Sequence, residues 1–115
     1  MLWLAPWFFI PAITAPTLIL VGGLMLKRPP NKPNGMYGYR TRRSRASQEA
    51  WDYSQVASAK RLLVGGIAMV VLGLPGLFVT VSEATGILLG LGLVMLGTFL
   101  PVIQTERELK ARFDP

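Results

Sequence analysis

Residues 62–103 read LLVGGIAMVVLGLPGLFVTVSEATGILLGLGLVMLGTFLPVI, and this stretch decides the fold. Its two apolar runs, 62–81 and 84–103, are each about 20 residues long, which is enough to cross the hydrocarbon core of a bilayer. Glu83 is the one charged residue in the whole stretch. Because so short a polar break separates the runs, we expect two membrane-spanning helices that lie antiparallel as neighbours.

Glycine and proline modify this helical hairpin. Gly86 and Gly90 form a GxxxG pattern, which permits close approach of two helix backbones. We expect that pattern to pack within the hairpin, and dimerisation is the alternative. Pro75 removes a backbone donor, so it predicts a kink and a freed carbonyl near Val71.

A third apolar run opens the chain, because residues 1–26 contain no charged side chain and residues 7–26 alone would span a bilayer. Trp3 and Trp7 fit an aromatic belt at one interface. Three prolines predict that the first half of this span is bent or only partly helical, although membrane helices also tolerate proline. These are Pro6, Pro11 and Pro16. The sequence therefore predicts an all-α integral membrane protein with three transmembrane helices.

The composition excludes several kinds of chemistry. The 115 residues are 51% hydrophobic and 16% charged, with a mean hydropathy of +0.43 and neither Cys nor His. Disulfides, thiolate catalysis, His-ligated metals and a His general base are excluded. The three spans hold no ionisable group that would mark an ion or proton path. No metal-ligand spacing, phosphate-binding glycine motif or nucleophile–base pair is present. We expect a protein without enzymatic activity and without a cofactor.

The basic residues predict the orientation in the membrane. Of the 12 Lys and Arg residues, nine lie in the connection 27–61 and three in the tail 104–115, whereas the turn around Glu83 has none. By the positive-inside rule, the connection and the C-terminus lie in the cytoplasm, and the N-terminus and Glu83 lie outside.

The connection and the tail carry helix signals of their own. Ser47 is suited to cap a helix, and Glu49 in the first turn complements the helix dipole. Residues 48–61 therefore predict a short interfacial helix that bends or runs on into the span 62–81, with Gln55 on its polar side. The tail 104–115 reads as a solvated helix end that carries two i,i+4 ion pairs. These are Glu106–Lys110 and Glu108–Arg112.

Two clusters in the connection invite functional interpretations. Arg42, Arg43 and Arg45 are expected against anionic lipid headgroups, and docking of an acidic partner protein is the alternative. Nucleic-acid binding is the weakest interpretation, because cytoplasmic membrane loops are generally basic. The stretch Tyr37-Gly-Tyr-Arg40 with Trp51 fits either an interfacial aromatic belt or a folded cap.

In the folded-cap interpretation, the Arg40 guanidinium stacks on a Tyr or Trp ring and pairs with Glu49 or Asp52. Gly35 and Gly38 would then supply the tight turns that such a cap needs.

The connection also carries a family resemblance. The pattern Asn34-Gly-x-Tyr-Gly-Tyr-Arg-Thr41, then Ser44, then Glu49-Ala-Trp51 resembles the signature of the SdpI-type membrane immunity proteins. The resemblance covers roughly residues 15–100. It implies a bacterial inner-membrane protein, and the founding member, which has more spans, protects its producer from a secreted toxin peptide and sequesters a transcriptional repressor. The motif residues expected to bind a partner are Asn34, Gly35, Tyr37, Gly38, Tyr39, Arg40, Thr41, Ser44, Glu49 and Trp51.

The leading hypothesis is therefore a non-enzymatic immunity or signalling protein that resists a membrane-active toxin peptide, docks a cytoplasmic regulator through the 34–51 loop, or does both. Alternatives are an accessory or structural subunit of a larger membrane complex and a small transporter built by oligomerisation. The expected partners are the bilayer, a regulator or toxin peptide, and further copies of the chain or a larger complex, with no nucleic acid.

Overall fold

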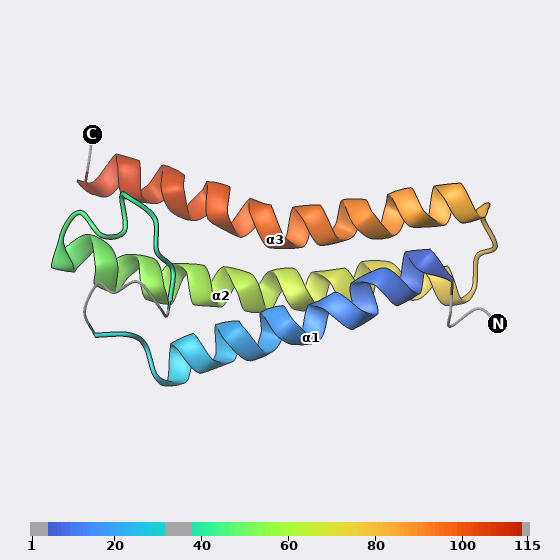
Figure 1. Cartoon of the computed structure of the whole chain (residues 1–115), viewed down its shortest axis with the longest axis horizontal. Helices are drawn as coiled ribbons and strands as arrows, with labels where there is room; N and C mark the ends of the chain where they lie inside the picture. The colour runs from blue at the N-terminus through green and yellow to red at the C-terminus, as the bar shows by residue number, and fades with distance from the viewer. Residues whose placement is uncertain (1–4, 32–37, 114–115) are drawn as a thin grey trace.

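Three helices lie side by side in a bundle whose extents are 49 × 28 × 20 Å (Figure 1). The computed structural model describes residues 5–31 and 38–113. Its elements are α1 (Pro6–Lys27), α2 (Gln48–Gly73), the 3-10 turn η2 (Leu74–Leu77) and α3 (Glu83–Phe113). All regular structure in these residues is helical, which confirms the all-α prediction.

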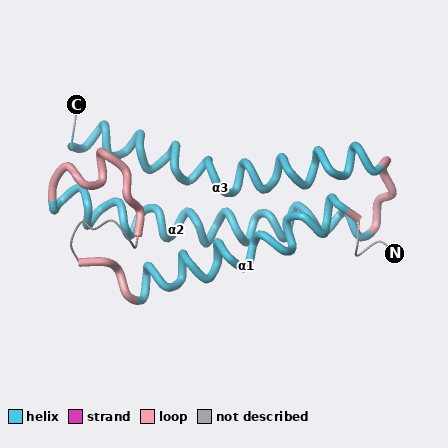
Figure 2. The backbone as a smooth tube through the Cα atoms, in the orientation of Figure 1, coloured by secondary structure: helices cyan, strands magenta, loops and turns pink. Residues whose placement is uncertain are grey.

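The connections lie at the two ends of the bundle (Figure 2). The α1–α2 connection and the C-terminal end of α3 share one end, which we call the loop end. The start of α1 and the α2–α3 connection share the other, which we call the turn end. The helices therefore run up, down and up.

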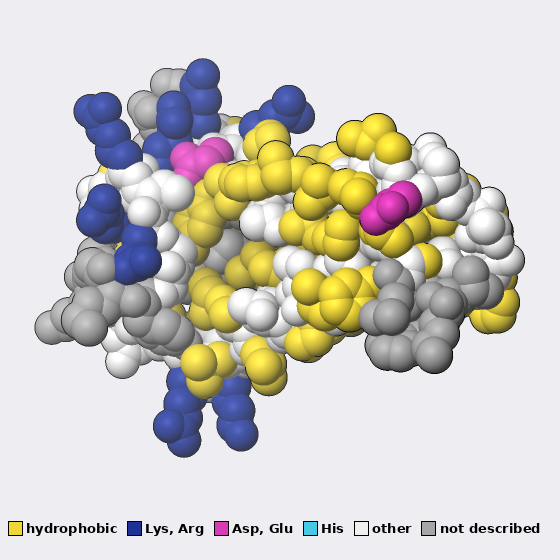
Figure 3. Space-filling model, turned by 45° about the vertical axis from the view of Figure 1, so that its right-hand side comes forward, with side chains coloured by type: hydrophobic (Ala, Val, Ile, Leu, Met, Phe, Trp, Pro, Cys, Tyr) yellow, Lys and Arg dark blue, Asp and Glu magenta, His cyan; other side chains and the backbone are white. Residues whose placement is uncertain are grey.

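All three helices are long and apolar enough to cross a membrane. The shortest, α1, has 22 residues and is about 33 Å long at 1.5 Å per residue, against a hydrocarbon core of about 30 Å. Large apolar side chains such as Leu20, Ile67 and Leu88 point outwards and are exposed. Hydrophobic side chains cover the middle of the molecule, and Lys and Arg gather at the loop end (Figure 3). This distribution is that of a three-span membrane protein.

The prolines in α1 do not interrupt it, so the prediction of a partly helical first half is wrong. Pro6 occupies the first turn, where a missing N–H costs nothing, and Pro11 and Pro16 lie inside the helix. Pro11 is buried against α2 at Gly73, where an added Cβ would lie 3.4 Å from the Pro11 ring. Packing against a neighbouring helix thus accommodates the ring.

The kink predicted at Pro75 is a helix end. At this proline α2 gives way to η2, and the Leu74 N–H is shared between the carbonyls of Val70 and Val71. One residue further along α2, the Leu72 carbonyl accepts a hydrogen bond of 3.1 Å from the Trp7 indole of α1. Trp7 therefore joins α1 to α2 at the turn end.

Glycines set the helix spacing, but the prediction for the GxxxG pair was wrong. A Cβ on Gly90 would lie 2.6 Å from the Pro6 carbonyl, and Gly86 also faces the start of α1, so the pair packs on α1 rather than within the hairpin. The close contact within the hairpin is made instead by Gly65 and Gly97, where an added Cβ would lie 2.5 Å from a carbonyl oxygen.

Residues 48–61 are the first part of α2, continuous with the span that follows. Ser47 caps the helix as predicted, since its hydroxyl accepts a hydrogen bond of 3.0 Å from the Ala50 N–H. An extension of α3 runs beside this part of α2 at the loop end (Figure 1).

Candidate functional site

The candidate site is the folded region at the loop end, which we call the cap: residues 28–31, 38–59 and 105–113. Its base is marked by Arg61 of α2, which donates a hydrogen bond of 3.2 Å to the Thr105 hydroxyl and forms an ion pair with Glu108 of α3. Beyond this level α2 and α3 continue, and the connection folds over them (Figure 1).

The core of the cap is a stripe of small and polar residues on α2. Trp51, Ser54, Gln55 and Ser58 are all buried, and their spacing of three or four residues places them on one helix face. Gln55 is 1% exposed, so the prediction that it lies on a polar, solvated side is wrong. The prediction failed because a buried face is ordinarily recognised by apolar residues.

The Gln55 side-chain amide binds the connection through the backbone N–H and carbonyl of a single residue, Tyr39. Its Oε1 accepts a hydrogen bond of 2.7 Å from the Tyr39 N–H, and its Nε2 donates one of 2.8 Å to the Tyr39 carbonyl. This pair resembles the pairing of a strand with its neighbour. Tyr39 lies in an irregular segment without a helix or sheet partner, so the amide satisfies both of its backbone groups.

Gly38 permits this approach because no other residue fits there. Its φ of 101° lies in the left-handed region, which is costly for residues with a side chain. A Cβ would collide with the Gln55 amide oxygen and would lie 2.6 Å from Pro30 Cγ.

A tight turn of Thr41 and Ser44 follows. The Thr41 N–H donates to the Ser44 hydroxyl at 2.8 Å, and the Ser44 N–H donates to the Thr41 hydroxyl at 3.1 Å. This reciprocal pairing has the logic of a helix capping box. Ser44 is fully buried and lies 3.1 Å from the Tyr39 carbonyl, so the turn is fixed to the clamped residue.

Trp51 ties the start of the connection to α2. Its ring is fully buried, and its indole N–H donates a hydrogen bond of 2.8 Å to the Pro30 carbonyl. A Trp in an interfacial belt would face the headgroups, so its burial favours the folded cap over the aromatic belt.

Tyr39 ties the connection to α3. Its phenol donates to the Glu106 carboxylate at 2.7 Å and lies 3.3 Å from the Val102 carbonyl. Burial raises the pKa of the Tyr39 phenol, and the hydrogen bond and charge of Glu106 raise it further. The phenol is thus a neutral donor throughout the physiological pH range.

Replacing Tyr39 with phenylalanine should lower the free energy of unfolding by about 1 kcal/mol at pH 8, because it removes a hydrogen bond to a charged group. The folded-state pKa lies above the unfolded value of about 10, so this contribution is complete below pH 10 and is lost as the pH rises above it. Thermal unfolding of the purified protein at pH 8 and pH 11 should therefore show a difference between wild type and Tyr39→Phe that shrinks at pH 11. Tyr53→Phe serves as the matched control and should leave stability near wild type at pH 8.

The tail is part of this structure, so its prediction as a solvated helix end is wrong. Thr105 and Leu109 are buried against the rest of the cap, and Glu106 and Glu108 bind Tyr39 and Arg61 across helices. The Arg112 guanidinium also lies 4.6 Å from the centroid of the Tyr53 ring on α2. The stacking and ion pairing expected of Arg40 stay predictions.

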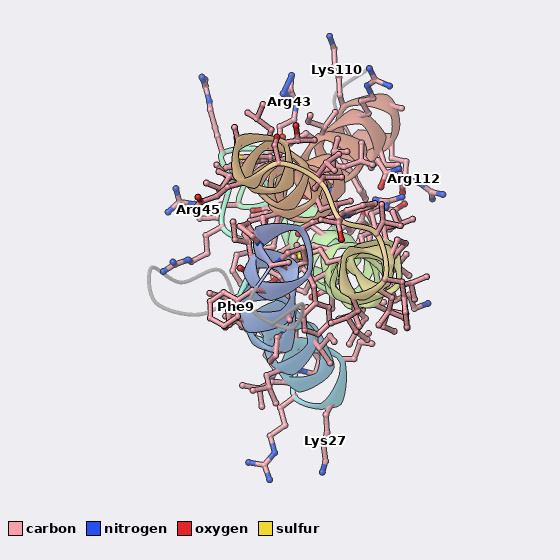
Figure 4. All side chains as sticks on the ribbon, turned by 90° about the vertical axis from the view of Figure 1, so that its right-hand side faces the viewer. Phe9, Lys27, Arg43, Arg45, Lys110 and Arg112 are labelled. Atoms are coloured by element: carbon pink, nitrogen blue, oxygen red, sulfur yellow. The ribbon has the colours of Figure 1, made fainter. Side chains whose placement is uncertain are left out.

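Other motif residues face outwards. Arg40, Arg42, Arg45 and Glu49 are exposed. The labelled side chains of Arg43, Arg45, Lys110 and Arg112 point away from the bundle axis in different directions (Figure 4). Asn34, Gly35 and Tyr37 lie outside the described residues.

A cleft opens between the connection and α3, with a volume of about 460 Å³. It is lined by Arg42 and Arg43 on one side and by Glu106 and Phe113 on the other. Arg43 Nη1 lies 4.0 Å from Glu106 Oε2. The cleft thus combines cationic, anionic and aromatic groups at one surface.

Gln55 and Glu106 are the two anchoring residues that sequence reasoning missed. The signal for Gln55 was its position four residues after Trp51, which places both side chains on one face. Glu106 gave no signal, because its partner Tyr39 lies far away in the sequence. Within the residues that the structure describes, no three side chains of His, Cys, Asp or Glu gather as a metal site.

Replacing Gln55 with leucine should destabilise the cap by about 1–3 kcal/mol, because the Tyr39 N–H loses its partner and the Tyr39 carbonyl keeps only the Ser44 hydroxyl, while the volume is kept. Hydrogen exchange of the Tyr39 amide should accelerate accordingly. Gln104→Leu is the matched control, since Gln104 is exposed on α3. Equal exchange in both variants would contradict the role of the Gln55 clamp.

Comparisons with known proteins identify the family of the chain. Residues 31–104, which include most of the cap, match the family model described as the SdpI/YfhL protein family. The chain is also 30% identical over 94 residues to a Bacillus subtilis (strain 168) protein described as "Uncharacterized protein YfhL", covering 81% of this chain and 80% of that protein. No solved structure matches the chain. By its sequence match and its three membrane-spanning helices, the chain is a multi-pass membrane protein that belongs to the SdpI/YfhL family.

Proposed function

We propose that this protein is a non-enzymatic immunity and signalling protein of the bacterial inner membrane, which protects the cell against a membrane-active toxin peptide and docks a cytoplasmic regulator through its cap. The observation that carries the proposal is the fastening of one loop to both α2 and α3. Pro30, directly after α1, is bound to Trp51 of α2, and Tyr39 is bound to Gln55 of α2 and Glu106 of α3.

Such a loop is suited to report on how the helices pack. A toxin peptide could enter the bilayer beside the bundle and shift α1 or α3 against α2. Such a shift would change the distances between the donors and acceptors of these hydrogen bonds. The cap surface would then change shape without any covalent reaction. A ligand can shift an equilibrium only by its differential affinity for the two states, so the toxin would have to prefer one packing of the helices.

The motif residues divide into two groups that suit this role. Gly38, Thr41, Ser44 and Trp51 hold the cap together from inside, whereas Arg40 and Glu49 are exposed at its surface, where a partner would contact them. In the cleft that also contains Glu106 and Phe113, Arg42 and Arg43 supply the groups that would contact an acidic segment of the regulator. Orientation with the loop end in the cytoplasm follows from the positive-inside rule.

The test compares cells that lack the gene with cells that carry wild-type or variant protein. Wild type should raise survival when the cells are challenged with membrane-active toxic peptides. Arg40→Ala should reduce both that survival and the recovery of a cytoplasmic partner with the purified protein, while the amount inserted in the membrane stays the same. Lys27→Ala, at the end of α1 and outside the motif, is the matched control and should behave as wild type.

Unchanged survival of the deletion strain across such peptides would refute the immunity role. Stoichiometric recovery of the protein with a large membrane assembly would instead indicate an accessory subunit. Recovery of a small soluble regulator, lost in Arg40→Ala, would support the signalling role.

A further inference from the structure

A groove runs along the outer surface between α2 and α3. It has a volume of about 380 Å³ and lies between residues Lys60 to Leu72 of α2 and Leu93 to Gln104 of α3. Along this groove Gly65 and Gly97 bring the two backbones into contact, and the Met69 side chain lies against Gly97.

The walls of the groove are apolar and its loop end is basic. Val64 and Leu96 stand exposed on either side. Lys60 and Arg61 line its loop end together with Gln104, and none of the described residues that line it is acidic. The Arg61 charge is balanced by its ion pair with Glu108, and Lys60 is exposed. The charged side chains among the described lining residues, Lys60 and Arg61, are thus both basic and lie at the mouth of an apolar channel.

The dimensions suit one leaflet of a bilayer. From Lys60 to Leu72 the groove follows α2 for about 18 Å at 1.5 Å per residue, against about 15 Å for half of the hydrocarbon core. A chain that enters at Lys60 and follows the groove would end near the bilayer centre.

We infer that this groove is a binding site for one anionic glycerophospholipid of the leaflet at the loop end, with an acyl chain along the groove and the phosphodiester at Lys60. The charge complementarity supports a lipid with net negative charge over a zwitterionic one, because both charged side chains among the described residues of the groove lining, Lys60 and Arg61, are basic. A bound lipid would bridge α2 and α3 directly below the contacts of Arg61 with Thr105 and Glu108, and so support the base of the cap.

The experiment is native mass spectrometry of the full chain in detergent, titrated separately with phosphatidylglycerol and phosphatidylcholine. Wild type should retain one phosphatidylglycerol in preference to phosphatidylcholine. Lys60→Gln should weaken phosphatidylglycerol binding about fivefold, the effect of one basic residue near an anionic lipid surface. Ala68→Phe, which fills the groove, should weaken binding of both lipids. Lys27→Gln removes an equivalent charge at the end of α1, away from the groove, and should leave binding unchanged.

Several results would overturn the inference. If wild type retained the two lipids equally, the charge of the lipid would not matter for binding. If Lys60→Gln and Lys27→Gln weakened phosphatidylglycerol binding equally, Lys60 would not be the residue that binds the phosphodiester. A lipid-free dimer would show that a second copy covers the groove. Lys60 is exposed, so its replacement leaves the folded bundle intact and the comparison with Lys27→Gln remains decisive.

Discussion

Replacing Trp51 with alanine should destabilise the cap by about 3–5 kcal/mol, the range for removing a large buried aromatic side chain. The indole is fully buried and holds the Pro30 carbonyl, so its loss both opens a cavity and frees the chain after α1. The membrane spans do not depend on this contact. We therefore expect proteolysis within residues 38–47 to accelerate strongly in detergent-purified protein, while the helical content falls only slightly.

Two further variants make this expectation specific. Phe78→Ala removes an aromatic ring that is 81% exposed at the turn end and should leave proteolysis unchanged. Trp51→Phe keeps an aromatic ring but loses the hydrogen bond to Pro30, and should cost about 1–3 kcal/mol. If Trp51→Ala resisted proteolysis as wild type does, the cap would not depend on its Trp51 core.

Replacing Gly38 with alanine should destabilise the cap by about 2–4 kcal/mol, which combines left-handed backbone strain with overpacking. The added methyl would collide with the Gln55 amide and press on Pro30, so the Tyr39 backbone would leave its clamp. Hydrogen exchange at Tyr39 and thermal unfolding both measure this effect.

Gly23→Ala is the matched control, because a Cβ on Gly23 meets nothing within 4 Å. In the interior of α1 the change to alanine should be neutral or slightly stabilising. Equal losses in the two variants would mean that glycine-to-alanine changes are harmful anywhere in this protein, and the argument from the Gly38 conformation would fail.

These variants also separate structure from function. Trp51→Ala and Gly38→Ala should reduce toxin resistance together with cap stability, because both act from inside the cap. Arg40→Ala should reduce resistance with a smaller loss of stability than either, because interactions of an exposed side chain contribute little to stability. A partner-binding residue and a cap-holding residue can thus be told apart even though both belong to the same motif.

The membrane spans were predictable from the sequence because hydrocarbon imposes a strict requirement on length and polarity. Ser47 was predictable because helix capping is local, and the end of α2 near Pro75 follows from one missing N–H. The partner of the Gly86–Gly90 pair was not predictable, since small residues permit close approach without specifying which helix approaches.

The anchors of the cap escaped prediction for a different physical reason. Gln55 and Glu106 are polar residues whose roles depend on long-range contacts with Tyr39, and polarity in a helix next to a membrane ordinarily indicates solvent exposure. The sequence left two interpretations of Trp51 open, because an indole ring is suited both to the membrane interface and to the core of a folded cap. Only the arrangement of three helices in space distinguishes them.

The hydrogen bond between Tyr39 and Glu106 has a consequence for biosynthesis. The loop leaves the ribosome before α2 and α3, so the Tyr39 N–H and the Tyr39 phenol lack their partners when they are made. Gln55 arrives with α2, but Glu106 arrives only when the last turns of α3 have been translated. The hydrogen bond between Tyr39 and Glu106 can therefore form only after the end of α3 has been made, so the closed cap requires α2 and α3 together.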